Sequence, residues 1–177
     1  MRTVLFIAIL GCSNARDTPP DASRAAASVD GGSTTGDAPP PPASDAGASR
    51  IIVINEVSAQ SDPDWFEIVN ATTSPLDTSQ FIFVDKEADF DKAVPFTLGT
   101  IGPGALATVD CDGVTVPFKL GSGESLWVYR ASDHALSDDV TWAVGESPDG
   151  GSYARIPDTF GPFMTSMHPT KGAPNEL

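Results

Sequence analysis

Basic residues are scarce in this sequence, which has 10 Lys and Arg against 24 Asp and Glu and a formal net charge of −14. Residues 51–177 contain 6 basic residues against 19 acidic ones, which leaves this part with a net charge of −13. The basic residues are scattered singly and form no stripe that could neutralise phosphates, so nucleic acid is excluded as a direct partner. The excess of acid instead favours solubility, because like-charged molecules repel one another.

Histidine and cysteine are also rare, with two of each. His134 lies in a polar turn and His168 precedes a proline, so neither belongs to a nucleophile motif, and two histidines are too few for a metal cluster. Cys111 stands between Asp110 and Asp112, whose negative charge disfavours a thiolate, and we expect it to be a small core residue. The sequence therefore predicts no enzymatic activity and no cofactor.

Large apolar residues are almost missing between Cys12 and Arg50, where Val29 is the only branched aliphatic or aromatic residue. The segment consists mainly of Ala, Pro, Ser, Asp, Gly and Thr, with four consecutive prolines at 39–42. Such a composition cannot offset the entropy of ordering the chain, so we predict a disordered tether over residues 12–50. A flexible chain of this length has a mean span of roughly 35 Å, with local stiffening at the prolines.

An apolar run of seven residues, Val4–Leu10, follows a basic start and ends at Gly11 and Cys12. Seven residues are too few for a membrane-spanning helix, which needs about 20, so the run is typical of a very short export signal over residues 1–11. The motif Ile9-Leu10-Gly11-Cys12 resembles a bacterial lipobox. This resemblance implies cleavage before Cys12 and a lipid anchor on it, and the serine at position 13 is similar to outer-membrane cargo. The alternative is a cytosolic protein with an apolar start.

From residue 51 onward, short β-branched and aromatic runs alternate with turn residues. Ile51–Val57 and Asp64–Asn70 flank a polar tip and are predicted to pair as a hairpin. Further strands are predicted over Gln80–Val84, Val94–Leu98, Ala105–Asp110, Val114–Leu120, Ser125–Ala131, Val140–Val144 and Ser152–Ile156. Pro95 places its strand at a sheet edge. Eight or nine short strands without helical periodicity predict an all-β domain, a β-sandwich over residues 51–177.

The order of these segments resembles that of a lamin-tail domain. The residues that carry the resemblance are Val53–Val57, Asp64–Asn70, Leu76–Asp85, Pro103-Gly104, Glu124–Tyr129, Ser152–Asp158 and His168–Asn175. The resemblance implies an immunoglobulin-like β-sandwich. Bacterial members of the family occur as anchored modules or beside hydrolases, so it also implies tethering or recognition rather than chemistry.

Four carboxylates recur at every second position, which is the spacing that begins a calcium-binding loop. They are Asp85, Glu87, Asp89 and Asp91. The segment lacks the glycine of the sharp turn and the glutamate that closes such a loop, so we interpret it as a solvated acidic loop. We interpret Asp62 and Asp64 at the hairpin tip in the same way, and we expect no metal.

Glu67 and Arg155 are the two charged residues for which the sequence predicts a structural role. Glu67 falls between Trp65 and Val69 on one face of a predicted strand, where an unpaired carboxylate would be costly to bury. Arg155 is similarly set between Tyr153 and Pro157 and could supply a two-pronged partner. We therefore predict an ion pair that joins the last strand to the early hairpin, the alternative being that both side chains point into water.

These observations favour a lipid-anchored lipoprotein of the cell envelope or surface whose β-sandwich is a non-catalytic binding or tethering module. Its expected partners are the membrane, through the lipid at Cys12, and an unidentified protein or envelope polysaccharide. The first alternative is an architectural spacer without a specific ligand. The second is an accessory to a secreted hydrolase, or a calcium-dependent binder.

Overall fold

Strand β1 (Ile52–Ser58) lies in the middle of the larger of two facing sheets in the computed structural model, which describes residues 50–176. This sheet is antiparallel in the order β11-β10-β1-β2-β7. Its other strands are β2 (Asp64–Asn70), β7 (Leu106–Cys111), β10 (Ser152–Arg155) and β11 (Phe163–Ser166). The predicted signal peptide and almost all of the predicted tether lie outside the described residues.

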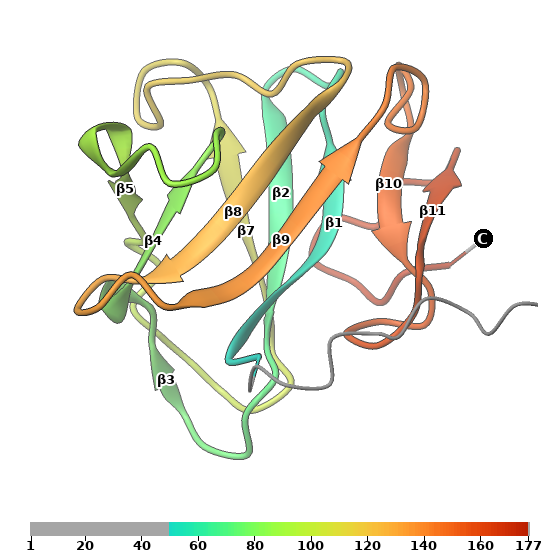
Figure 1. The fold of residues 1–177 in the computed structure, drawn as a ribbon. Coiled ribbons are helices and arrows are strands. Elements are labelled where there is room, and N and C mark those ends of the chain that lie inside the picture. Colours follow the sequence, from blue (N-terminus) through green and yellow to red (C-terminus); the bar gives the residue numbers. More distant parts are fainter. Residues whose placement is uncertain (1–49, 177) are drawn as a thin grey trace, which may run out of the picture. The chain divides into compact units, whose positions relative to one another are not determined.

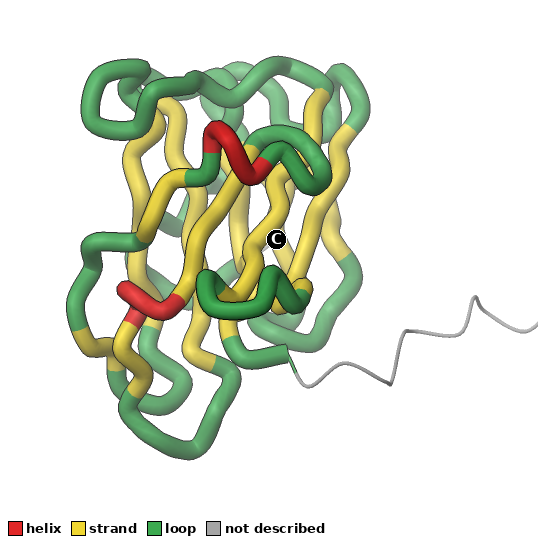
Figure 2. The backbone as a smooth tube through the Cα atoms, turned by 60° about the vertical axis from the view of Figure 1, so that its left-hand side comes forward, coloured by secondary structure: helices red, strands yellow, loops and turns green. Residues whose placement is uncertain are grey.

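The second sheet is also antiparallel and has the order β5-β4-β8-β9. It consists of β4 (Phe81–Val84), β5 (Val94–Pro95), β8 (Glu124–Arg130) and β9 (Leu136–Trp142), and in Figure 1 its long strands β8 and β9 cross in front of the larger sheet. A short ribbon of β3 (Leu76–Asp77) and β6 (Thr100–Ile101) and two 3₁₀ turns, η1 (Thr78–Gln80) and η2 (Phe90–Lys92), complete the described part. Figure 2 shows the two layers of strands with loops at both ends.

The core lies between the two sheets and is built around three phenylalanine rings. Phe66 of β2, Phe83 of β4 and Phe96 meet with ring centroids 4.7–6.2 Å apart. Every residue of β1 and β2 is buried. One face of these strands packs into the core, and segments at the C-terminal end of the chain contribute to covering the other face.

Side chains of β9 close one side of the sandwich by bonding to the backbone of β1. The Ser137 hydroxyl accepts a hydrogen bond from the Ile52 N–H and donates one to the Ile52 carbonyl, each at 2.9 Å. The Asp138 carboxylate accepts the Ile54 N–H at 2.9 Å. Buried backbone groups must be paired, and here two short polar side chains replace an inter-strand ladder.

The predicted all-β sandwich and its opening hairpin are confirmed, because β1 and β2 pair antiparallel and the described residues contain no α-helix. Val94–Leu98 does start at a sheet edge, as β5. The predicted strand Val114–Leu120 is wrong. Its backbone folds around Asp112, whose carboxylate accepts the N–H groups of Val114, Thr115 and Val116 at 2.7–3.3 Å. Strand β11 and the β3–β6 ribbon were not predicted.

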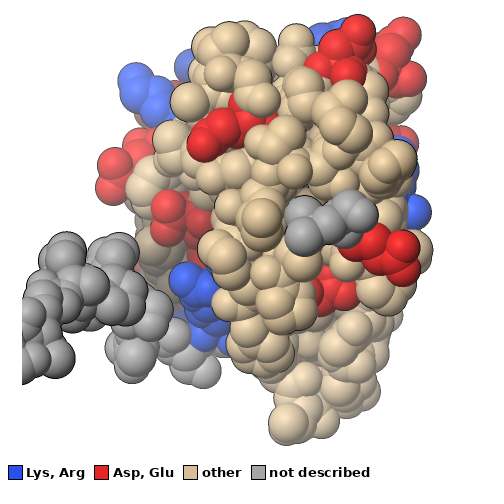
Figure 3. Space-filling model, turned by 90° about the vertical axis from the view of Figure 1, so that its right-hand side faces the viewer, with Lys and Arg blue, Asp and Glu red and all other residues tan. Residues whose placement is uncertain are grey.

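Charged side chains are dispersed over the surface. On the face seen from the β10–β11 side, acidic groups form separate spots on a mostly uncharged surface, and basic groups are few (Figure 3). Within residues 50–176, no helix has the length and apolar character to cross a membrane.

Candidate functional site

A cavity of about 420 Å³ opens between the edge strands β5 and β7, on the side of the sandwich opposite β9. Its lining comes from β4, the segment 94–98, β7 and the loop that follows β7. The residues are Phe83, Val94, Pro95, Phe96, Thr97, Leu98, Thr108, Val109, Asp110, Asp112, Thr115 and Val116. A cavity of this size falls within the range of ligand-binding pockets.

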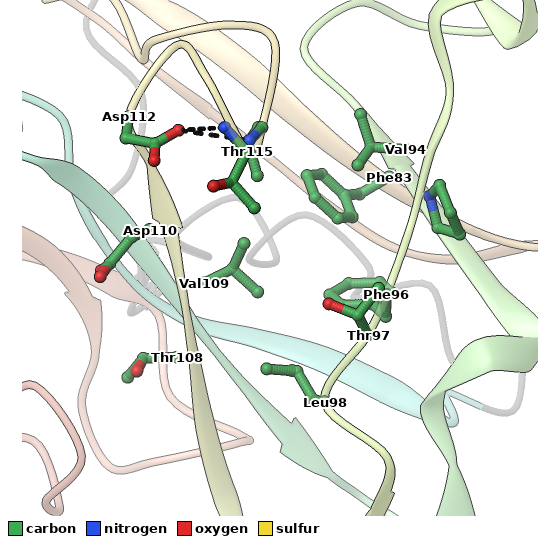
Figure 4. Close-up of a pocket in the computed structure, with 12 residues that line it drawn as sticks. Phe83, Val94, Phe96, Thr97, Leu98, Thr108, Val109, Asp110, Asp112 and Thr115 are labelled. Carbon is green, nitrogen blue, oxygen red and sulfur yellow. Dashed lines mark hydrogen bonds between the residues drawn. The ribbon is translucent and has the colours of Figure 1, made fainter.

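The lining is apolar at its base and polar at its rim (Figure 4). Phe83 and Phe96 are almost fully buried, and Val109 projects beside them from β7. Thr97 and Thr115 are exposed, and Thr108 is half-buried. A small number of polar groups around an apolar floor is the usual design of a site that orients an apolar ligand group.

The free edge of β7 forms one wall of the cavity. β7 pairs with β2 alone, and the Asn70 N–H donates to the Ala105 carbonyl at 3.2 Å at the start of that ladder. In an antiparallel ladder, alternate residues turn their N–H and C=O groups to opposite sides. The backbone groups of Leu106, Thr108 and Asp110 therefore face away from β2, towards the open side of the sheet.

The charged residues that line the cavity are both acidic. The Asp110 carboxylate is at the exposed end of β7 and forms an ion pair with the Lys171 ammonium. Hydrogen bonds to the Asp112 carboxylate, with that from the Val114 N–H contributing most, hold its pKa below the usual value. Asp112 is thus ionised at neutral pH and makes its part of the cavity rim negative, whereas the charge of Asp110 is compensated by Lys171.

Comparison with known proteins does not identify the chain. No protein-family model matches it, and no curated protein is significantly similar in sequence. The lamin-tail resemblance stays a prediction.

The predicted ion pair between Glu67 and Arg155 does not form. The Arg155 guanidinium instead lies 3.1 Å from the Asp138 carboxylate, and its Nε donates to the Ile54 carbonyl at 2.9 Å. The register explains the error: Ala154 and Glu67 both pair with Glu56 of β1, so Arg155, the next residue, points to the opposite face of the sheet.

Glu67 belongs to a group of polar side chains beneath residues 168–176, which we call the C-terminal strap. Its two carboxylate oxygens accept the Asn55 side-chain amide at 3.1 Å and the Gly172 N–H at 2.7 Å. Glu56 lies directly opposite Glu67 and accepts hydrogen bonds from Thr170 of the same strap. Both glutamates are fully buried, so the strap supplies the donors that the burial of these carboxylates requires.

The environment of Glu67 favours its neutral form. Desolvation by burial is the main cause that raises the pKa of this carboxyl from 4.5 to about 7, and the nearby Glu56 and Asp158 carboxylates add to it. The hydrogen bonds from Asn55 and Gly172 act in the opposite direction, because they stabilise the ionised form.

The other residues singled out in the sequence are dispersed. The acidic segment from Asp85 to Asp91 is a turn in which Asp89 pairs with Lys92, and His134 stacks on Phe90 with ring centroids 3.9 Å apart. Asp64 is not the solvated residue we expected. It is buried and accepts the Leu120 N–H at 3.1 Å, because the long loop after β7 folds back over it. Among residues 50–176, no group of three or more His, Cys, Asp or Glu side chains is arranged so that it could hold a metal ion.

Only one of the two cysteines lies within the described residues. Cys12 lies outside the described residues. Cys111 is fully buried and unpaired, and burial, together with the charges of Asp64 and Asp110, raises the pKa of its thiol to about 12. A thiol in that state is a core residue rather than a nucleophile.

The sequence offered only one signal for the cavity. Pro95 predicted a sheet edge at residues 94–98, and that edge forms one wall. The other wall was not predictable. The alternation of apolar and polar residues does not indicate that β7 lies at the end of the larger sheet, nor that a loop forms around Asp112.

Proposed function

We propose that the β-sandwich is the non-catalytic binding module of a lipid-anchored envelope protein, and that its ligand occupies the cavity between β5 and β7. The observation that carries the proposal is the contrast between the two sides of the sandwich. The β9 side is closed by Ser137 and Asp138, whereas the β7 side presents an apolar cavity and a free strand edge. An open, partly apolar site with few polar groups is suited to recognition.

The polar side chains of the described part support binding rather than chemistry. The buried carboxylates of Asp64, Glu67 and Asp138 all accept backbone N–H groups and so serve the fold. The polar groups that line the cavity are threonine hydroxyls and the carboxylates of Asp110 and Asp112. The lining contains no histidine or cysteine. A nucleophile needs an adjacent base within hydrogen-bond reach. Thr115 lies beside the Asp112 carboxylate, but this carboxylate already accepts three backbone N–H groups, which lower its pKa and make it a weak base.

The anchor is the second half of the proposal and rests on the sequence Ile9-Leu10-Gly11-Cys12, with the lamin-tail resemblance in support of a tethering role. Cys12→Ser should abolish incorporation of a labelled fatty acid and leave the precursor uncleaved, because both steps need the thiol. The measurement is metabolic labelling followed by gel electrophoresis in a bacterial host. Cys111→Ser is the matched control and should label like the unchanged chain, and equal labelling of the Cys12→Ser chain would disprove the anchor.

The cavity can be tested by site-specific photo-cross-linking in intact cells. A photoreactive amino acid at Thr97 or Thr115, both exposed at the rim, should capture a discrete adduct that is seen by mass shift. The same amino acid at Thr141, exposed on β9, is the control and should give no such adduct. Equal or absent cross-linking at all three positions would instead support the architectural spacer.

A further inference from the structure

We propose that the cavity receives an extended peptide segment that adds to the free edge of β7 as a new strand, with an apolar side chain inside the cavity and a basic residue beside Asp110. This inference rests on the proposed binding function and specifies the class of ligand. The partner is therefore a protein with an exposed, extended, basic segment.

The backbone of β7 provides the first part of the recognition. The N–H and C=O groups of Leu106, Thr108 and Asp110 face away from β2 and are spaced as a strand requires. Unpaired strand edges are ready templates for another chain, and sheet edges protect themselves with lysine, proline or bulges. β7 has none of these between Leu106 and Cys111, and its ladder to β2 is regular.

The cavity provides the second part, through the pleat of the sheet. Val109 lies opposite Phe66 of β2, so its side chain points towards the core. A peptide residue paired with Val109 would point to the same side, into the cavity and towards Phe96. Alternate side chains in pockets are how strand addition obtains its specificity.

Charge provides the third part. The peptide residue opposite Asp110 points to the outer face, where the carboxylate lies at the exposed end of β7. Asp110 and Asp112 are the charged residues of the lining, and residues 51–177 carry a net charge of −13. Opposite charges directly across a strand pair are favourable and like charges are not. The Asp110 carboxylate already pairs with Lys171 but is about half exposed, so a basic peptide residue opposite it would add a second cation to the same carboxylate.

Two other occupants fit less well. The chain's own residues 13–49 contain five aspartates and two arginines, so like charges would meet at the rim. A polysaccharide is usually held by an exposed aromatic face and by side-chain hydrogen bonds. The cavity aromatics Phe83 and Phe96 are only 1% and 2% exposed and offer no such face.

The experiment uses the full-length chain labelled with ¹⁵N and an eight-residue probe peptide. The probe alternates threonine with valine or leucine and carries a lysine at each end. We expect saturable binding that slows hydrogen exchange of the Leu106, Thr108 and Asp110 amides. A probe with N-methyl groups on alternate amides keeps its side chains but cannot form the ladder, and it should bind at least about tenfold more weakly because backbone hydrogen bonds are lost.

Two further changes test the charge contribution and the backbone contribution to binding separately. A probe with glutamate in place of both lysines should bind several-fold more weakly, most clearly at low salt. Thr108→Pro removes an outward N–H from an edge strand, a position where proline is tolerated, and should weaken binding about tenfold while native chemical shifts are kept elsewhere. If this variant does not fold, the N-methylated probe tests the same contact on the unchanged chain.

Equal binding of the methylated probe, or protection confined to other strands, would overturn the strand addition. So would no protection of β7 by the probe, or sedimentation that shows a dimer combined with β7 amides that are protected without the probe. If Thr97 gives cross-links in cells but the probe does not protect β7, the proposed binding function stands and the ligand is not an extended peptide. Absence of both signals would reject the binding function itself.

Discussion

Asp138→Ala is expected to lower the free energy of unfolding by about 3–5 kcal/mol, which is the usual cost of removing one partner from a buried ion pair. The side chains of Asp138 and Arg155 are only 2% and 9% exposed. The substitution leaves the Arg155 guanidinium without its carboxylate and the Ile54 N–H without its acceptor, in the middle of the larger sheet. Urea unfolding monitored by tryptophan fluorescence measures the loss.

Asp133→Ala is the matched control for this prediction. Asp133 also pairs with an arginine, Arg130, at 3.4 Å, but both side chains are about half exposed, and such pairs contribute about 0–1 kcal/mol. Arg155→Ala together with Asp138→Ala should cost less than the two single changes added, because each removes the same contact. Losses of similar size at Asp133 and Asp138, or strict additivity, would contradict a structural role for the pair.

Between about pH 4.5 and pH 7 the protein is expected to lose up to about 3 kcal/mol of stability through Glu67 alone. The pKa of this carboxyl is raised to about 7 in the folded chain, against 4.5 ordinarily, and one unit corresponds to about 1.4 kcal/mol. In this window the folded state binds more protons at Glu67 than the unfolded state does. The contribution of Glu67 to stability is therefore greatest below pH 4.5 and is lost as pH rises through the folded pKa.

Glu67→Gln isolates that contribution, because the amide has nearly the same shape and does not titrate. Asp64, Glu124 and Asp139 also have raised pKa values and contribute with the same sign, so the difference between variant and unchanged chain is the relevant quantity. Chemical unfolding at pH 4.5, 6 and 8 should give a flatter profile for Glu67→Gln. Glu87→Gln, at an exposed position, should keep the original slope, and parallel profiles for all three chains would refute the prediction.

Local sequence patterns predicted those parts of the fold that depend on local chemistry. Ile51–Val57 and Asp64–Asn70 are apolar and close in sequence, so their pairing as β1 and β2 could be predicted. Val114–Leu120 has equally good strand composition, but its N–H groups bond to the carboxylate of Asp112, and alternation cannot reveal this competition.

The errors in the candidate site have a different physical origin. Glu67 and Arg155 were paired because each is a charged residue in an apolar context, yet a strand alternates its faces and β1 stands between β2 and β10. Which carboxylate meets the arginine is decided by sheet order and register, which depend on the whole chain. The same holds for the cavity, since its two walls are edges that become neighbours only when the sheets face each other.

β1 is the first strand after Arg50, so any pull transmitted along the chain from residues 1–49 enters the sandwich there. β1 is held on both sides, since it pairs with β2 and β10 on its two edges and bonds to side chains from β9. A pull along its axis would load the ladder to β2 and the shorter ladder to β10 in shear. The β7 edge lies beyond β2 in the sheet order, so a load that enters at β1 reaches it only through the β1–β2 and β2–β7 ladders.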